Sequence, residues 1–325
     1  MGTVRRSCMI ILIVATAVAA VLAMTGLVYQ TEPPWRWIFM ALVAAAGIGI
    51  VRAGARGWRA GWGGFALAVV IGILWWSSIR PSNDRVWAPD VAHGVTAEIN
   101  GADVVLHNVR DFDWRSETDF TPRWVTRRYA LDQLTSVDLI SSVWSSPAIA
   151  HTLIGFGFSN GERVVFSAEV RREKTEAFSE VGGFFKQFEL VMIAATERDI
   201  VRLRTNIRGE SVTLLPLRVS QQQAQALFLG FANRANALSR TPEFYQTVTT
   251  NCTTVIFELA RQVDTRVPLD WRILLSGYLP GYLYDLGIIR TDAPLEQVLR
   301  EAAISERAKS LPPGADYSAG IRAAR

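Results

Sequence analysis

The stretch that decides the fold of the larger part of this chain is HTLIGFGFSNGERVVFSAEV, residues 151–170. Its two ends, HTLIGFGF and RVVFSAEV, are strand-length segments rich in aromatic and β-branched residues. The polar residues between them, 159–162, include Asn-Gly, a pair that favours the tight turn of a hairpin. This stretch therefore predicts two antiparallel strands, and with them a sheet.

Further strands are predicted on both sides of this hairpin. VTAEI and ADVVLHNV form a second hairpin candidate around Asn100 and Gly101. The remaining elements expected in this region are strands at 188–194 (FELVMIA) and 211–217 (SVTLLPL) and a helix from about Glu197 to Asn206.

Two amphipathic helices are predicted after the strands. Ser220 and Gln223 form a capping box at the start of a helix whose apolar residues keep a 3.6-residue period until Pro242 ends it. A second helix is expected in NCTTVIFELARQV, beginning at or just before Cys252. Strands followed by helices predict an α+β fold, in which helices pack on an antiparallel sheet.

The domain built from these elements is expected to cover residues 96–305. Residues 81–95 are polar and bracketed by prolines, which predicts a linker before the domain. Residues 306–325 are polar and interrupted by Pro312, Pro313 and Gly314. A loosely held C-terminal tail is therefore predicted.

The residues before the linker, 1–80, are predicted to anchor the domain in a membrane. Three uncharged runs, of 25, 15 and 20 residues, predict transmembrane helices at about 8–29, 37–51 and 60–79. The middle run would be only about 22 Å long as a helix, so it needs local thinning of the bilayer or snorkelling of its flanking arginines. Six of the eleven tryptophans lie near the ends of these runs, as in an interfacial belt. A cleaved signal peptide is the alternative for the first run.

The charge distribution predicts the orientation of these helices. Residues 1–80 carry seven arginines and one acid, whereas residues 81–325 carry 27 basic and 29 acidic residues. The net charge of +4 therefore belongs to the apolar part, which argues against nucleic-acid binding. Because arginines precede the first run and fill the second loop, we expect the domain on the periplasmic side of a bacterial inner membrane. If the middle run does not span, the domain would be cytoplasmic.

The predicted domain contains one cysteine, Cys252, in the first turn of a predicted helix. At that position the free N–H groups and the helix dipole lower the pKa of a thiol and favour the thiolate. Asn251 and Thr253 add polar neighbours. Cys252 is thus a candidate nucleophile, with a small buried residue and a surface thiol as the alternatives.

A thiolate nucleophile usually needs a histidine base, and the chain offers His93, His107 and His151. His151 begins the strand HTLIGFGF, where a side chain can project from the end of a sheet, and it is the preferred candidate of the three, with a hydrogen-bonded structural histidine as the alternative. A third residue to orient the imidazole could be Ser167 or Glu169, the polar residues of the next strand. Three scattered histidines give no metal-ligand spacing, and no cofactor motif occurs, so neither a metal nor a cofactor is expected.

Five strings in the chain together resemble one protein family. They are VRDFDWRSETDFTPRW (109–124), AHTLIGFGF (150–158), SAEVRREK (167–174), ERDIVRLRTNIR (197–208) and RTPEFYQTVTTNCTT (240–254). This combination resembles the Lnb-type lipoprotein N-acyltransferase periplasmic domain, over about residues 96–320. The family is similar to a circularly permuted papain or NlpC/P60 fold, in which the histidine precedes the cysteine along the chain.

The resemblance implies roles for individual residues. It makes Cys252 the nucleophile and His151 its base, and it favours Glu169 as the accessory catalytic residue. Arg202 and Arg204 also lie in a matching string, where we expect a solvated or salt-bridged helix face. The candidate oxyanion or accessory residues are Asn251, Thr253 and Ser167.

The activity that the resemblance implies is that of a membrane-anchored thiol acyltransferase of the cell envelope. Such an enzyme moves a fatty acyl chain from a membrane lipid through a cysteine thioester to an amine, the N-terminus of a lipoprotein. Membrane lipids and lipoproteins are the expected partners. A cysteine peptidase or amidase acting on cell-wall peptides, and a non-catalytic membrane scaffold, are the alternatives. An apolar groove beside Cys252 favours the first, and a polar, open groove favours the second.

Overall fold

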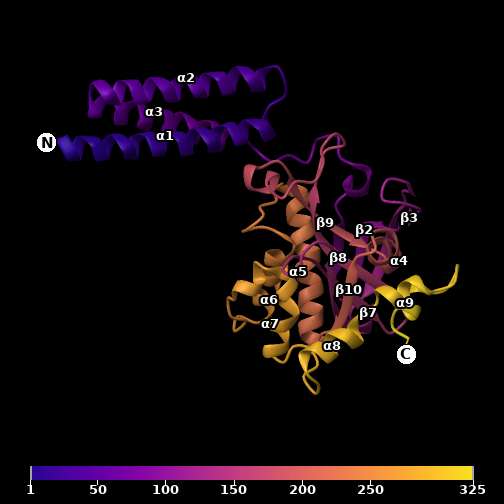
Figure 1. The fold of residues 1–325 in the computed structure, drawn as a ribbon. Coiled ribbons are helices and arrows are strands. Elements are labelled where there is room, and N and C mark those ends of the chain that lie inside the picture. Colours follow the sequence, from indigo (N-terminus) through magenta and orange to yellow (C-terminus); the bar gives the residue numbers. More distant parts are fainter. Residues whose placement is uncertain (1, 324–325) are drawn as a thin grey trace. The chain divides into compact units, whose positions relative to one another are not determined.

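The computed structural model describes residues 2–323, and the chain forms two compact units. The first unit contains Met1–Ser82 together with Phe178–Phe188. The second unit contains Asn83–Ala177 and Glu189–Arg325. Figure 1 labels the three helices of the first unit and many of the helices and strands of the second.

Three long helices make up most of the first unit: α1 (Gly2–Gln30), α2 (Trp35–Arg56) and α3 (Trp58–Ser78). Stretches of 18 residues within them have mean hydropathies of 2.6, 2.0 and 1.6, and each helix is long enough to cross a membrane. The middle helix is longer than its uncharged run because it continues through Arg52 and covers 22 residues. At 1.5 Å per residue its length is about 33 Å, but its ends include Arg36, Arg52 and Arg56, so crossing the hydrocarbon core still requires snorkelling of these arginines or a thinned bilayer.

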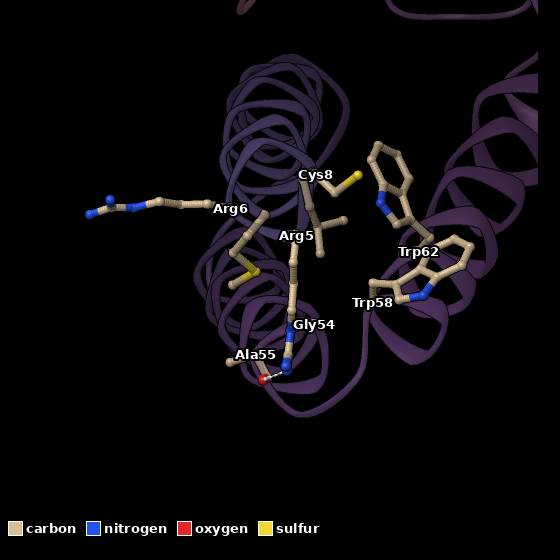
Figure 2. A pocket seen from close by; sticks show the side chains of 9 residues that line it. Arg5, Arg6, Cys8, Gly54, Ala55, Trp58 and Trp62 are labelled. Carbon is tan, nitrogen blue, oxygen red and sulfur yellow. Dashed lines mark hydrogen bonds between the residues drawn. The ribbon is translucent and has the colours of Figure 1, made fainter. Parts of the chain in front are cut away.

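Small residues bring these helices together at one end of the bundle. A Cβ atom on Gly61 would lie 2.5 Å from the Cα atom of Gly54, so a side chain there would push the two helices apart. A cavity of about 660 Å³ lies beside this contact and is lined by Arg5, Trp58 and Trp62 among others (Figure 2). The Arg5 guanidinium donates a hydrogen bond to a backbone carbonyl near the end of α2, which ties α1 to α2.

An eight-stranded sheet is the centre of the second unit. Its spatial order is β1-β2-β9-β8-β7-β6-β10, with β5 also paired to β2, and neighbours are antiparallel except β2 and β9. A separate small sheet joins β3 (Asp113–Trp114) and β4 (Phe120–Thr121). The strands of the main sheet are β1 (Thr96–Asn100), β2 (Asp103–Arg110), β5 (Trp124–Ala130), β6 (Leu134–Val143), β7 (Ala150–Phe158), β8 (Arg163–Arg171), β9 (Glu189–Ala195) and β10 (Ser211–Pro216).

Both predicted hairpins are present. Their turns contain Gly101 at φ +61° and Gly161 at φ +86°, in the left-handed region that favours glycine. β5 and β6 were not predicted, because charged and hydroxyl residues break their apolar pattern. In β6, Asp138 is nonetheless buried, since it forms an ion pair with Arg322.

Helices cover both faces of the sheet, so the predicted α+β fold is confirmed. On one face, Phe156 of β7 and Phe166 of β8 pack against Phe228 and Phe231 of a long helix. The opposite face is covered by shorter helices at the end of the chain and after β9. The helices of this unit are α4 (Glu197–Arg202), α5 (Gln221–Arg240), α6 (Cys252–Val263), α7 (Leu279–Asp285), α8 (Leu295–Ala302), α9 (Ser305–Lys309) and α10 (Tyr317–Gly320).

The segments before and after the predicted domain are packed more tightly than the sequence suggested. Val91 and Val95, from the expected linker, are buried in the two cores. In the expected tail, Tyr317 and Ile321 are buried, and Arg322 bridges Asp138 and Glu197. Buried apolar side chains on and just after a short helix, together with the Arg322 ion pairs, hold this end of the chain, which differs from the loose tail predicted.

Candidate active site

Cys252 is the first residue of α6, and its neighbours fix the start of that helix. The Asn251 side chain accepts hydrogen bonds from the N–H groups of Thr253 and Thr254, both at 2.9 Å. The Thr254 hydroxyl accepts in return from the Asn251 N–H at 2.8 Å, which completes a capping box. The Asn251 amide nitrogen donates to Thr247. Asn251 therefore lies beside the cysteine as the helix cap.

The Cys252 side chain is buried, with 8% of the residue exposed. Burial alone raises the pKa of a thiol, but here the positive charge of His151 and a hydrogen bond from it act in the opposite direction. The backbone N–H of Thr152 and the hydroxyl of Thr253 also hydrogen-bond the sulfur. The net effect is a lowered pKa of Cys252, which favours a thiolate paired with an imidazolium.

His151 is the second residue of β7, the strand that the hairpin stretch predicted. The start of this strand is held by Ser276, whose hydroxyl donates to the Ala150 carbonyl at 2.6 Å and accepts from the Ala150 N–H at 2.9 Å. Gly277 follows and leaves no room for a side chain, because a Cβ atom there would lie 2.0 Å from the Pro147 carbonyl oxygen. A distant loop thus fixes the backbone on which His151 stands.

Both candidate partners of His151 contact the same ring nitrogen. Nε2 of His151 lies 2.7 Å from Ser167 Oγ and 3.1 Å from Glu169 Oε1. The Ser167 hydroxyl itself donates to Glu169 Oε1 at 2.8 Å, so Nε2 carries the proton in this network. Nδ1 is the nitrogen that remains for Cys252. The sequence could not choose between Ser167 and Glu169, and the fold brings both to the imidazole.

The charges around His151 favour its protonated form. Burial lowers the pKa of this imidazole, and Arg204 does so too, but the Glu169 carboxylate and the cysteine outweigh them and raise it to about 9. For Glu169, burial opposes ionisation, while His151, Arg204 and Arg110 hold the pKa of the carboxyl well below its ordinary value. The ionised carboxylate therefore stabilises the imidazolium beside the thiol.

Arg204 forms a salt bridge, one of the two settings expected for it, but it is buried instead of lying on a solvated helix face. It is buried, with 3% of the residue exposed, and its guanidinium lies 3.1 Å from Glu169 Oε1. The helix after β9 changes to a wider π-helical turn at Leu203–Ile207, and this turn carries the arginine inward. Arg202, two residues earlier, is partly exposed near Asp113, as the sequence predicted.

The other two histidines lie elsewhere. His107 contacts Glu98 at 2.9 Å on the β1–β2 hairpin, and His93 packs edge-on against Trp124. Thr152 and Thr253, one residue after the histidine and the cysteine, have hydroxyls 3.3 Å apart and join β7 to α6. Among the residues that the structure describes, no cluster of three or more histidine, cysteine and acidic side chains could hold a metal ion.

Residues 120–277 match the family described as the Lnb N-terminal periplasmic domain. This part of the chain is similar to an Lnb-type domain. The matched range contains Cys252, His151, Glu169 and Arg204, whereas α1, α2 and α3 lie outside it. No curated protein and no solved structure matches the chain. An Lnb-type domain after three apolar helices fits a membrane-associated protein with a periplasmic C-terminal part.

Proposed function

We propose that this protein is a membrane-anchored thiol acyltransferase that uses Cys252 as the nucleophile, His151 as the base and Glu169 as the residue that holds the imidazolium. The observation that carries the proposal is a buried thiol of lowered pKa at a helix start, hydrogen-bonded to a histidine that Glu169 keeps protonated. That arrangement is the activated cysteine of nucleophilic acyl transfer. It requires no cofactor.

In the first half of the reaction, the Cys252 thiolate attacks the ester carbonyl of a phospholipid. The carbon–sulfur bond forms, the carbon–oxygen bond breaks, and the imidazolium of His151 gives its proton to the departing alcohol. In the second half, a free amine attacks the thioester, the carbon–nitrogen bond forms, and the thiolate leaves. The amine proton returns to His151, which restores the starting ion pair.

The negative oxygen that forms in each half needs donors close to the sulfur. The Asn251 side chain accepts hydrogen bonds from the N–H groups of Thr253 and Thr254. The N–H of Cys252, at the positive end of the helix dipole, is therefore the backbone donor that we assign to the oxyanion. Thr253 can add its hydroxyl, which lies 3.8 Å from the sulfur. Asn251 then contributes by fixing the first turn of α6, and not as a direct donor.

The surface beside His151 favours an acyl chain over a peptide as the group transferred. Two segments meet where the Ser276 hydroxyl bonds the backbone of Ala150: residues 144–150 and residues 271–278. Both segments expose large apolar side chains. We name these residues the apolar rim: Trp144, Ile149, Trp271, Leu274, Leu275 and Tyr278. Each methylene moved from water onto such a surface gains about 0.8 kcal/mol, so a long alkyl chain is bound more strongly than a polar peptide.

The anchor supports a substrate pair that resides in a membrane. Three apolar helices would keep the domain at the periplasmic face of the inner membrane, where a phospholipid donor and a lipoprotein acceptor share one surface. The acceptor we propose is the free N-terminal amine of a lipoprotein. The resemblance to papain and NlpC/P60 enzymes supports the thiol chemistry, and water in place of the amine would make the same site an amidase.

The test is acyl transfer by the full chain reconstituted in phospholipid vesicles. A lipopeptide with a free N-terminal amine is the acceptor, and mass spectrometry measures its N-acylated product. We expect product from the parent protein and from the control Cys8→Ala, which removes the cysteine of α1, but none from Cys252→Ala. Cleavage of a peptide substrate without N-acylation would favour the amidase, and full activity of Cys252→Ala would contradict thiol catalysis.

A further inference from the structure

The segment Phe178–Phe188, between β8 and β9, belongs to the same unit as the three apolar helices. It is bonded to the end of α1, where the Tyr29 hydroxyl lies 3.2 Å from the Ser179 hydroxyl. The Gln30 side chain donates hydrogen bonds to the carbonyls of Phe185 and Lys186, at 2.8 and 2.9 Å. A segment far along the chain is thus fixed to the last turn of the first helix.

The same segment is bonded to the end of α3. The Lys186 ammonium donates to the Trp76 carbonyl at 2.7 Å and lies 4.8 Å from the centre of the Trp76 ring. The Phe185 ring meets Trp76 edge to face at 6.3 Å and stacks on Tyr29 at 5.9 Å. In an anchor of three consecutive spans, α1 and α3 cross the membrane in the same direction. The C-terminal ends of α1 and α3 therefore lie on the same side of the membrane, and the chain continues from α3 on that side.

Three large apolar side chains of this segment are half exposed or more. Phe178, Val181 and Phe184 are 58%, 50% and 50% exposed. The tyrosine and tryptophans at the ends of α1 and α3, with Lys186 of the segment beside them, mark the boundary between lipid tails and head groups. Apolar side chains held at that level lie next to the lipid-exposed faces of α1 and α3.

We propose that Phe178–Phe188 is a fourth membrane contact of the anchor, whose Phe178, Val181 and Phe184 enter the outer leaflet at the boundary between acyl chains and head groups. The partner that these side chains contact is the lipid bilayer that α1 and α3 cross. The Lys186 ammonium stays at the head-group level, where it caps the carbonyls at the end of α3. This inference does not depend on the proposed catalytic activity.

The test uses the full chain in phosphatidylcholine vesicles, with the two native cysteines replaced by serine and one new cysteine carrying an environment-sensitive fluorophore. Phe184→Cys and Val181→Cys report on the segment. Leu67→Cys, at a 61% exposed position in α3, is the lipid reference. Glu296→Cys, at a 93% exposed side chain of α8, is the water reference. A spin-labelled lipid and aqueous iodide serve as the two quenchers.

We expect both probes on the segment to show blue-shifted emission and to be quenched by the spin-labelled lipid several-fold more than the probe at Glu296→Cys. Iodide should quench them weakly, as it does the probe at Leu67→Cys. Strong iodide quenching at both positions would overturn the proposal, because the side chains would then lie in water. Protection from both quenchers would also overturn it, since it would indicate cover by protein, such as a second copy of the chain.

Discussion

Replacing Glu169 with glutamine is expected to uncouple the thiol of Cys252 from its histidine. The pKa of His151 is about 9 instead of the ordinary 6.5, a difference that corresponds to about 3 kcal/mol in favour of the imidazolium. The charge of Glu169 makes the largest contribution that raises the pKa of His151, whereas burial and Arg204 lower it. With glutamine the side chain keeps its shape and loses its charge. We therefore expect the pKa of His151 to fall to its ordinary value or below.

The sign of the effect on the thiol follows from this change. A neutral imidazole no longer lowers the pKa of Cys252, so burial dominates and the pKa of the thiol rises. The assay is the rate of alkylation by iodoacetamide as a function of pH, in the full chain carrying Cys8→Ser. At neutral pH the alkylation rate should fall about 10- to 100-fold. A change of about 1.4 kcal/mol alters the thiolate population tenfold, and only part of the 3 kcal/mol that favours the imidazolium acts on the thiol.

The matched control for this variant is Glu162→Gln, in the turn of the same hairpin, where the side chain is 37% exposed. It should alkylate like the parent at every pH. An unchanged pH profile in Glu169→Gln would show that the charge of Glu169 does not control the pKa of the Cys252 thiol.

Four further outcomes are expected. Asn251→Ala removes the cap of α6 and should cost about 0.5–2 kcal/mol of stability, measured as a lower Tm, whereas Asn251→Asp should keep most of it. Gly277→Ala places a methyl group 2.0 Å from the Pro147 carbonyl oxygen, so it should slow alkylation of the thiol by displacing the strand that carries its histidine. Arg204→Met removes a charge-assisted hydrogen bond worth about 1.5–3 kcal/mol, and the Tm should fall accordingly. Acyl transfer should decline above about pH 9, as His151 loses the proton that the leaving alcohol needs, and a flat rate from pH 8 to 10 would contradict that role.

The parts of the fold that sequence predicts are those fixed by neighbouring residues. The turn at Gly161, the capping box at Ser220 and the start of α6 at Cys252 all depend on contacts within a few residues, so their patterns are visible in the chain. Length and apolar composition likewise predict three helices that could span a membrane.

The parts that sequence did not predict depend on contacts between distant residues. Arg204 is buried because a π-helical turn directs it toward Glu169, and no periodicity reveals such a turn. Ser276 holds the strand of His151 from 126 positions away in the chain. The attachment of Phe178–Phe188 to the apolar helices was also not foreseen, since the bonds come from residues at the ends of α1 and α3.

Formation of an acyl thioester on Cys252 is the decisive test of the proposed thiol acyl transfer. The full chain is incubated with phospholipid vesicles that contain no amine acceptor, and the peptide that carries Cys252 is weighed by mass spectrometry before and after treatment with hydroxylamine. We expect a fatty acyl mass on this peptide that hydroxylamine removes and that is absent in His151→Ala. A thiol that stays unmodified while the same preparation N-acylates an added lipopeptide would contradict it.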